Sequence, residues 1–406
     1  MNTHDKLQFL DEWSRRELRD ILNYYRQYVY DPSGGFYGAV LRTLDPVKHA
    51  DRSLILNARI MWTFARAFRT FGDPSSLDMA VHARKYIEEH FVDPKYGGAY
   101  WMVDSQGEPD DETKYPYGIA FVIYGGAELM RAAGDKEGLK LARNMYEVLE
   151  EHALDTENGG YFETFTRDWQ RRDDSFNIPD PSLGSKALNT HLHMIESYTA
   201  LMLVDDDPKL RKTVGELIDI MTHKLLDQEY FHYKPYMTSD WKATDTLFSF
   251  GHDIEGAWLL SEAAEAYGGH DLVEQTKPVA VKIADACAKG INPHTGGLYA
   301  EANEQGIIDR QMSWWVQSEA AIGFFNAYEL TGDERYLDLT MNIVNYIREY
   351  ISDTSDGHFR EWLMRGDLDP EDGANELRVN AWKGPYHNGR MCIELIERVA
   401  RMQSKL

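Results

Sequence analysis

A short phrase recurs along the chain and constrains the fold more than any other feature. An Asp or Asn is followed within a few residues by Gly-Gly and an aromatic or apolar residue, in DPSGGFYG (31–38), DPKYGGAYW (93–101), DTENGGYFE (155–163) and NPHTGGLYAE (292–301). A weaker copy, DQEYFHYKPY, begins at Asp227, and a degenerate copy, DTSDGHFREW, begins at Asp353. Spacings of about 60 to 70 residues therefore divide the chain into six units.

Each unit has room for two helices between its Gly-rich turns. Six helical hairpins can form an open solenoid or a closed ring. The segments LNARIMWTF, ALNTHLHMIESY, FGHDIEGAWLL and SWWVQSEAAIGFF are apolar with a few polar residues, which is typical of helices that surround an axis and favours closure. A length of 406 residues alone suggests two or three domains. The repeat predicts instead an all-α fold: one (α/α)6 barrel domain over residues 1–406, with short strand-like Gly-aromatic turns around a cavity.

The net charge of −24 argues against nucleic-acid binding, because such a surface repels phosphate and no basic patch offsets it. Cys287 and Cys392 lack disulfide or metal-site spacing and fit a reducing compartment. The N-terminal residues alternate charged and apolar side chains, unlike a signal peptide, and no window approaches the roughly 20 apolar residues of a membrane helix. We therefore expect a soluble, cytoplasmic protein without a membrane partner.

Histidines stand out in two of the apolar segments. Residues four apart on a helix share a face, whereas residues two apart point about 200° away from each other. Asn189 and His193 should thus face one side and His191 another, which argues against a metal-binding pair and leaves His191 as a core residue. His252 and Glu255 can face one cavity; Glu255 either orients the imidazole or forms a buried polar pair with it, and the spacing supports both interpretations.

The loop AWKGPYHNGR precedes the last helix and contains Trp382 and His387. A loop that only connects two helices would not need Trp, Tyr, His, Asn and Arg so close together, so we interpret it as functional. The chain has no GxGxxG, P-loop or HExxH motif. We therefore predict no cofactor and no metal.

The segments LNARIMWTF, GGAYWMV, LNTHLH, FGHDIE, WWVQSEA and WKGPYHNGR occur in this order and resemble the cellobiose 2-epimerases of the N-acylglucosamine 2-epimerase superfamily. The resemblance covers nearly the whole chain. It implies an (α/α)6 barrel, in agreement with the six units. It also implies an isomerase that interconverts glucose and mannose at C2 of the reducing end of β-1,4-linked disaccharides such as cellobiose, lactose and mannobiose, with no metal or nucleotide in the chemical step.

The resemblance also assigns site residues. His252 and His387 match the two acid/base histidines, and His193 matches the histidine that assists ring opening. The residues expected to hold the sugar are Arg59, Tyr117, Asn189, Glu255, Glu301, Trp315, Trp382 and, in the loop before LNTHLH, Asp180.

One stretch departs from the family pattern. Where the family usually has His, then Tyr, then Gln, this chain has Tyr115, Tyr117 and Ile119, with Pro116 inserted into the pattern. The departure puts the particular disaccharide in question more than the reaction.

These residue types suit the reaction. A C2 proton can be removed only while C1 is an open-chain aldehyde, because the charge must spread onto its oxygen, so the ring must first open. An imidazole, with a reference pKa of about 6.5, can move the required proton near neutrality. One neutral and one charged imidazole, His252 and His387, would then supply a base and an acid.

The remaining groups would support that proton transfer. Arg59 would stabilise the enediolate oxygen with a permanent cation, and Glu255 would hold His252 in its working tautomer. Trp315 and Trp382 would stack on sugar rings and exclude water, which fits an aromatic content of 12%.

Other functions remain open at this stage. Within the isomerases these are an aldose-ketose isomerase acting on mannose-type monosaccharides and an N-acylglucosamine 2-epimerase. Outside them are a glycoside hydrolase of the same toroid, which would use two carboxylates, and a non-catalytic sugar-binding protein. The expected partner is a small-molecule disaccharide, and we expect a monomer or a weak homodimer.

Overall fold

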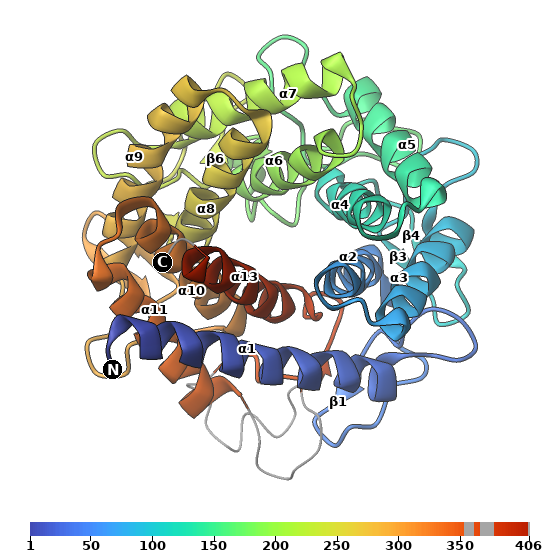
Figure 1. Cartoon of the computed structure of the whole chain (residues 1–406). Coiled ribbons are helices and arrows are strands. Elements are labelled where there is room, and N and C mark those ends of the chain that lie inside the picture. Colours follow the sequence, from blue (N-terminus) through green and yellow to red (C-terminus); the bar gives the residue numbers. More distant parts are fainter. Residues whose placement is uncertain (353–360, 366–376, 405–406) are drawn as a thin grey trace.

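The computed structural model describes residues 1–352, 361–365 and 377–404. Two concentric rings of helices surround an axis (Figure 1). The inner helices are α2 (Leu54–Phe71), α4 (Pro116–Ala133), α6 (Leu188–Met202), α8 (Phe250–Tyr267), α10 (Trp314–Thr331) and α13 (Tyr386–Gln403). The outer helices are α1 (Thr3–Tyr24), α3 (Pro74–Tyr86), α5 (Lys136–His152), α7 (Pro208–Asp219), α9 (His270–Ala288) and α11 (Glu334–Tyr346).

The ring closes through the two ends of the chain. Each inner helix contacts the next one around the axis, and α13 completes the circle by contacting both α10 and α2. Each outer helix packs on the inner helix of its own hairpin, except that the first helix, α1, packs on the last, α13. This closure confirms the predicted (α/α)6 barrel, whereas the assignment of residues 1–406 to a single domain stays a prediction.

Local signals set the ends of the helices at the hairpin turns. Inner helices α2, α4 and α10 end at Gly72, Gly134 and Gly332 in the left-handed conformation that glycine adopts without strain. The next residue in each case is an Asp whose side chain accepts a backbone N–H of the following outer helix. A Gly-Asp pair therefore reverses the chain at these hairpins.

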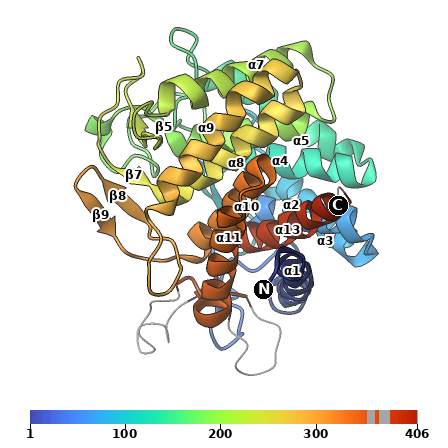
Figure 2. The same cartoon turned by 60° about the vertical axis from the view of Figure 1, so that its left-hand side comes forward.

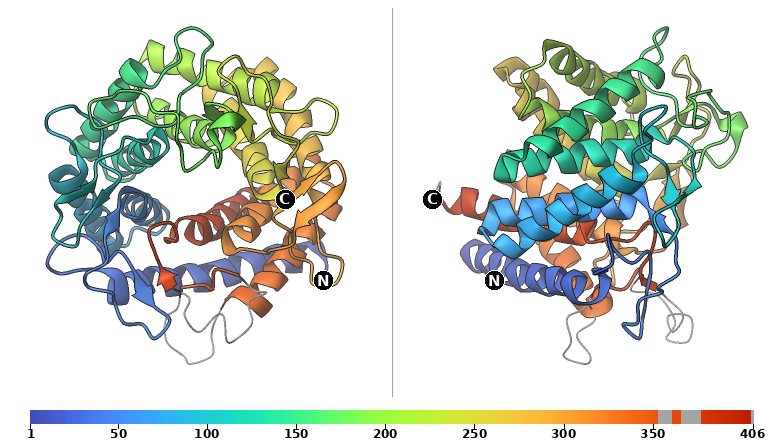
Figure 3. Two further views of the ribbon diagram at one scale, coloured as in Figure 1. Left: turned by 180° about the vertical axis from the view of Figure 1, so that it is seen from behind. Right: turned by 90° about the vertical axis from the view of Figure 1, so that its right-hand side faces the viewer.

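Short strands lie at the opposite end of the barrel, as the side views show (Figures 2 and 3). They are β1 (Val40–Leu41), β2 (Arg52–Ser53), β3 (Met102–Val103), β4 (Pro109–Asp111), β5 (Lys186–Ala187), β6 (Tyr236–Met237), β7 (Phe248–Ser249), β8 (Glu301–Asn303), β9 (Gly306–Asp309) and β10 (Leu377–Val379). They form four antiparallel sheets, ordered β1-β10, β2-β3-β4, β5-β6 and β7-β8-β9. In three of these sheets, the strand before an inner helix pairs with the strand that follows the same unit's outer helix. The β1-β10 pair again joins the two ends of the chain.

The recurring phrase forms the same turn in the copies at 93, 155, 227 and 292, and a turn one residue shorter at Asp31, whose backbone N–H donates to Gly35 at 3.2 Å. In these four copies the side-chain oxygen of the Asp or Asn accepts the backbone N–H two residues later, at 2.9 to 3.0 Å. The backbone N–H of the same residue donates across the turn, as from Asp93 to Gly98 at 3.0 Å and from Asp227 to His232 at 2.9 Å. The weaker copy at Asp227 is thus confirmed. The copy at Asp353 begins outside the described residues.

Buried cations tie these turns to the inner helices. Arg52, Lys114 and Lys186 each lie two residues before an inner helix, and they pair with Asp31 (2.7 Å), Asp93 (3.0 Å) and Asp155 (2.8 Å) respectively. Each carboxylate belongs to the turn that follows the preceding outer helix. These ion pairs therefore fix where α2, α4 and α6 begin, and with them the side chains on their first turns.

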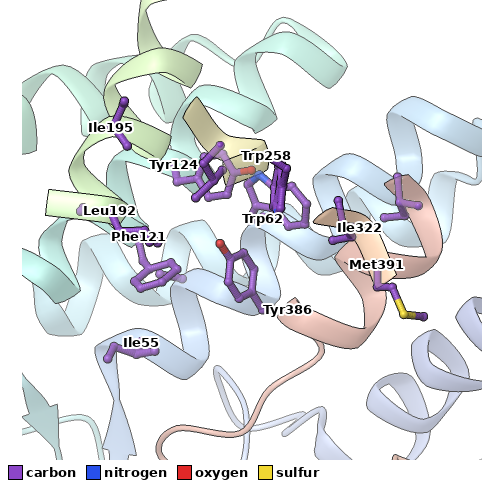
Figure 4. Close-up of a cluster of buried hydrophobic side chains, with 14 of the residues drawn as sticks. Ile55, Trp62, Phe121, Tyr124, Leu192, Ile195, Trp258, Ile322, Tyr386 and Met391 are labelled. Atoms are coloured by element: carbon purple, nitrogen blue, oxygen red, sulfur yellow. The ribbon is translucent and has the colours of Figure 1, made fainter. Parts of the chain in front are cut away.

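Aromatic and aliphatic side chains fill the space between the inner helices below their first turns (Figure 4). The Trp62 ring stacks on Tyr124, with centroids 4.9 Å apart, and meets Tyr386 edge-on at 5.5 Å. Trp62 and Trp258 are fully buried, as expected for tryptophans that pack in the core. None of the helices in the described ranges is both long and apolar enough to cross a lipid bilayer.

Candidate active site

The first turns of the inner helices enclose a cavity of about 200 Å³ at the strand end of the barrel. It is lined by Arg59, Tyr117, Asn189, His193, His252, Glu255, Trp314, Trp315, Trp382 and His387. These residues come from all six inner helices and from the loop before α13. The structure thus brings together all but two of the site residues predicted from the sequence.

The two exceptions are Asp180 and Glu301, which do not line this cavity. Asp180 is exposed and caps a short 3-10 helix (Pro181–Leu183), where its carboxylate accepts the N–H of Ser182 at 2.8 Å. Glu301 is partly buried in β8, opposite Ser249, the residue that caps the helix carrying His252. Their contacts with a sugar stay predictions.

Two of the three cavity histidines are paired with a buried carboxylate. His193 Nδ1 lies 2.9 Å from Glu196, one turn further along α6. His387 Nδ1 lies 2.7 Å from Glu319 of α10. When the carboxylate of such a pair is ionised it accepts the Nδ1 proton, and Nε2 is then the nitrogen that can take up or deliver a proton. Sequence reasoning missed both carboxylates.

Glu255 does not make the predicted hydrogen bond to His252. Both line the cavity, but the Glu255 carboxylate accepts a hydrogen bond from the buried Arg390, and no hydrogen bond joins it to His252 within the described residues. The guanidinium offers a stronger, charged partner than a neutral imidazole does. The interpretation of Glu255 as the residue that sets the tautomer of His252 is therefore corrected.

The expectation of one neutral and one charged imidazole also needs correction. Burial, together with the nearby His193, lowers the pKa of His252 to about 4. Burial lowers the pKa of His387 well below its ordinary value, and the cations Arg59 and Arg390 act in the same direction. Both imidazoles are therefore neutral near pH 7 in the free site.

Arg59 supplies the positive charge that borders the cavity. Its guanidinium donates to the Trp382 carbonyl oxygen at 2.7 Å and to the Tyr117 hydroxyl at 3.1 Å. The guanidinium carbon lies 4.4 Å from the centre of the Phe121 ring and 5.0 Å from that of Tyr386. These contacts hold a permanent cation where a developing negative charge can be stabilised.

An aromatic wall leads from the cavity to the surface. Trp382 is 40% exposed, and its ring lies 5.1 Å from Phe176, 5.6 Å from Trp101 and 6.3 Å from Tyr117. Deeper in, the Trp315 ring lies 4.8 Å from that of His252 and 5.8 Å from that of His387.

Trp101 and Phe176 were not predicted from the sequence. Trp101 follows the Gly-Gly-aromatic turn at 97–100 and could have been found from its place beside that repeat. Phe176 lies in an irregular loop, and its sequence carries no comparable signal.

The departure from the family pattern affects the scaffold more than the cavity. Pro116 is the first residue of α4, a position where proline is favoured because its missing N–H has no helical partner. Tyr115 joins the aromatic wall, with its ring 4.7 Å from those of Trp101 and Phe176.

Ile119 is fully buried, four residues after the residue that caps α4. The equivalent residues of α6, α8 and α10 are His191, Asp253 and Gln317, each of which accepts a backbone N–H of a Gly-aromatic turn at 2.7 to 3.0 Å. This contact confirms His191 as a satisfied core residue. Ile119 does not line the cavity, and its Cδ1 would lie 3.4 Å from a Cβ added at Gly98, so it packs near the second turn.

Among the residues that the structure describes, two groups of side chains have the spacing that a metal ion would need, within 4.8 Å: His193 with Glu196 and Glu255, and Glu255 with Glu319 and His387. The carboxylates of both groups already share one guanidinium as a partner. Arg390 pairs with Glu196, Glu255 and Glu319. The geometry therefore favours an ion-pair cluster over a metal centre.

Three imidazoles, a guanidinium and three indoles around one cavity of an (α/α)6 barrel point to one class of protein, the carbohydrate isomerases. Comparison with known proteins gives the family. Residues 35–387 match the model of the N-acylglucosamine 2-epimerase family, and the chain belongs to that family. It is an isomerase, a sugar epimerase.

Individual relatives agree over nearly their whole lengths. The cellobiose 2-epimerase of Bacteroides fragilis is 36% identical over 393 residues, which cover 95% of this chain and 100% of the relative. The solved structure of a sugar epimerase from a ruminal bacterium has a TM-score of 0.89 at 35% identity, and the match covers 95% of this chain and 98% of that one. The cellobiose 2-epimerase of Bacillus thermoamylovorans B4167 has a TM-score of 0.88 at 32% identity, with 96% and 99% covered.

Proposed function

We propose that this enzyme interconverts glucose and mannose at C2 of the reducing end of β-1,4-linked disaccharides. The observation that carries the proposal is the convergence of His193, His252 and His387 with Arg59 in one cavity beside an aromatic wall. The relatives named cellobiose 2-epimerase support a disaccharide as substrate. The proposed steps use only side chains of this chain.

His193 would open the sugar ring. Its Nδ1 faces Glu196, so its Nε2 is the nitrogen that can take the proton of the C1 hydroxyl and pass it to the ring oxygen. The product of this step is the open-chain aldehyde. Glu196 stabilises the charged imidazole that forms between the two transfers.

His387 is prepared to act as a base at C2. Its imidazole is neutral, and Glu319 leaves Nε2 free to remove the C2 proton. The electron pair of the broken C–H bond moves onto the C1 oxygen and gives an enediolate, whose charge Arg59 would stabilise.

His252 would return a proton to the opposite face of C2. It is neutral in the free site and must first take a proton from solvent water before it can act as an acid, and His387 returns the proton that it removed to solvent. The negative charge of the enediolate beside it raises the pKa of its imidazole and allows this. In the reverse direction His252 and His387 exchange roles.

The remaining predicted residues would hold the disaccharide. Tyr117, Asn189 and Glu255 offer polar atoms to the hydroxyl groups of the reducing sugar, and the indoles of Trp315 and Trp382 offer stacking surfaces. Glu301 and Asp180 lie outside the cavity, and we propose that they contact the second sugar ring.

An isotope experiment tests the reaction. In D₂O, turnover of cellobiose should place deuterium at C2 of both the glucose and the mannose form, as followed by NMR. Product that carries no solvent deuterium would contradict exchange through two histidines. His252→Ala and His387→Ala should each lower kcat at least about 10²-fold, and a variant that keeps nearly the full rate would remove that histidine from the mechanism.

The products separate the competing functions. A ketose would identify an aldose-ketose isomerase, free glucose would identify a hydrolase, and binding without conversion would identify a sugar-binding protein. Turnover of N-acetylmannosamine in place of cellobiose would identify an N-acylglucosamine 2-epimerase.

The assembly and location of the protein are also proposals. We propose a monomer or a weak homodimer in a reducing, cytoplasmic environment. The presence of Cys287 and Cys392 as free, buried thiols supports the reducing environment. Gel filtration at several protein concentrations would test the assembly.

A further inference from the structure

One buried guanidinium lies at the centre of the charged groups beneath the cavity. Arg390 is fully buried in the first turns of α13, three residues after His387. One of its terminal nitrogens donates to Glu196 and to the Tyr386 hydroxyl. The other donates to Glu255 and pairs with Glu319 at 2.7 Å. The Arg390 side chain thus joins α13 to α6, α8 and α10.

Two of these carboxylates are the ones that orient catalytic histidines. Glu196 pairs with His193 at 2.9 Å, and Glu319 pairs with His387 at 2.7 Å. A single cation therefore touches both His–Glu pairs, although the histidines serve different steps of the proposed reaction.

The protonation state of such a carboxylate decides what its histidine can do. An ionised carboxylate only accepts, so the imidazole donates from Nδ1 and keeps the lone pair on Nε2 free. A protonated carboxyl can donate to Nδ1 instead, and the proton of the neutral imidazole then sits on Nε2. An imidazole in that tautomer cannot act as a base at the sugar.

We propose that Arg390 is a positioning residue that keeps Glu196 and Glu319 ionised, and so holds His193 and His387 in the tautomer whose Nε2 is free to act on the sugar. This inference rests on the proposed epimerase function and adds to it the residue that prepares both histidines together. Arg390 has no place in the cavity lining and need not touch the substrate.

The surroundings explain why a cation is needed at this position. Burial favours the neutral acid, and three carboxylates close together repel one another. Burial and the charge of Glu319 raise the pKa of Glu255 to about 7, even with Arg390 opposing them. Burial likewise raises the pKa of Glu319 against the opposing effect of Arg390. At Glu196 burial is outweighed by Arg390 and by the hydrogen bond from His193, and the pKa stays below its ordinary value.

Every inner helix presents titratable or charged groups to this cluster. They are Arg59 from α2, Tyr117 and Tyr124 from α4, His193 and Glu196 from α6, His252, Glu255 and Glu262 from α8, Glu319 from α10, and Tyr386 and His387 from α13. Arg59 binds Trp382 and Tyr117. Arg66 of α2, which also acts on Tyr124 and Glu262, pairs with Glu394 and Glu397. Arg390 is thus the cation that the three carboxylates share.

The substitution Arg390→Lys tests the proposal. Lysine keeps one positive charge, but its compact ammonium group cannot reproduce the fork of donors that reaches three carboxylates. The pKa values of Glu196 and Glu319 should rise, so that more enzyme holds the unproductive tautomer at pH 7. We expect kcat for cellobiose to fall at least about 10-fold at pH 7 and to recover as the pH rises. The acid limb of the profile should move up by about one pH unit, which corresponds to a 10-fold change in proton affinity.

Arg398→Lys is the matched control. Arg398 lies two turns further along the same helix, is also buried, and pairs with Glu394 at 3.0 Å and with Glu329, away from the cavity. Its replacement should lower the melting temperature without moving the pH profile. KM should change less than kcat in Arg390→Lys, because Arg390 acts through the histidines.

Glu319→Gln provides a second route if Arg390→Lys does not fold. The amide oxygen can still accept the Nδ1 proton of His387 but does not titrate. The acid limb should therefore move to lower pH in this variant. A uniform loss of kcat at all pH values in Arg390→Lys, a shift of the same size in Arg398→Lys, or an unmoved acid limb in Glu319→Gln would each overturn the proposal. Failure of the wild-type enzyme to epimerise cellobiose would refute the proposed function instead, and these two failures are distinguishable.

Discussion

Asp93→Asn isolates the charge that holds the second Gly-aromatic turn. The Asp93 carboxylate lies 3.0 Å from Lys114 Nζ, and neither side chain has any exposed surface. An Asn can still accept the N–H two residues later, as Asn292 does at 2.9 Å in its own copy of the turn. Arg167, the other cationic partner of Asp93, is one-third exposed and can turn to solvent. The substitution therefore keeps the turn and leaves Lys114 buried without its carboxylate.

Two independent estimates give the expected loss in the free energy of unfolding. Breaking a buried ion pair by removing one partner costs about 3–5 kcal/mol. Alternatively, Lys114 can lose its proton. An unfolded lysine has a pKa of about 10.4, so deprotonation at pH 7 costs about 1.36 kcal/mol for each of about 3.4 units, or about 4.6 kcal/mol. Since the second route sets an upper limit, we expect the free energy of unfolding to fall by about 3 to 4.6 kcal/mol.

The loss should depend on pH in a defined direction. In the variant, folded protein holds Lys114 neutral, whereas the unfolded chain keeps it charged up to a pKa of about 10.4. The unfolded state then binds one more proton, and the stability of the variant rises with pH. The difference from wild type should shrink by about 1.4 kcal/mol per unit between pH 7 and 9.

Urea denaturation followed by tryptophan fluorescence at pH 7, 8 and 9 measures this difference. Asp227→Asn is the control, because Asp227 opens the same turn but pairs with a partly exposed Lys234 at 3.4 Å. Its loss should be below about 1 kcal/mol. A loss below about 1 kcal/mol for Asp93→Asn, or a loss that does not change with pH, would refute the reasoning.

Three further substitutions separate catalytic from structural roles. His193→Ala should lower kcat at least about 10²-fold. His191→Ala should keep kcat near wild type but lower the free energy of unfolding by about 1–3 kcal/mol, because it leaves the Tyr161 N–H unpaired. Steady-state kinetics and urea denaturation of both variants check this contrast. Gly98→Ala should lower the melting temperature, because φ is +68° and a Cβ would lie 2.6 Å from the Trp169 ring; an unchanged melting temperature would contradict this.

The repeated turn made the ring predictable from the sequence, because its determinants are local. An Asp or Asn, the Gly-Gly pair and the following aromatic residue lie within about nine residues of one another, so their spacing reveals the turn without knowledge of tertiary contacts. The cations at Arg52, Lys114 and Lys186 carry an equally local signal, two residues before each helix, that the sequence analysis did not use.

The charged cluster could not be predicted in the same way. Glu319 and His387 are 68 residues apart, and Arg390 and Glu196 are 194 apart. Which of the 67 acidic residues meets which histidine depends on how the ring closes. Glu255 illustrates the difficulty. Its spacing from His252 suggested a partner on the same helix, but in the closed ring its carboxylate accepts a hydrogen bond from Arg390.

The inner helices place their functional side chains at the same positions along each helix. Counted from the residue that caps each helix, the second and sixth positions face the cavity or the cluster beneath it: Asn189 and His193 in α6, and Trp315 and Glu319 in α10. The sixth positions of α2 and α8 are Arg59 and Glu255. One structural position thus recurs around the ring, and the residues placed there decide the reaction.

A hydrolase on this scaffold would need two carboxylates free to act on the glycosidic oxygen and on C1. Here Glu196, Glu255 and Glu319 are held by Arg390, and the groups left free to move protons at the cavity are imidazoles. By our proposal, the same guanidinium that pairs with these carboxylates keeps Glu196 and Glu319 ionised behind His193 and His387. The pairing of Arg390 with these three carboxylates should therefore both support epimerisation and prevent hydrolysis.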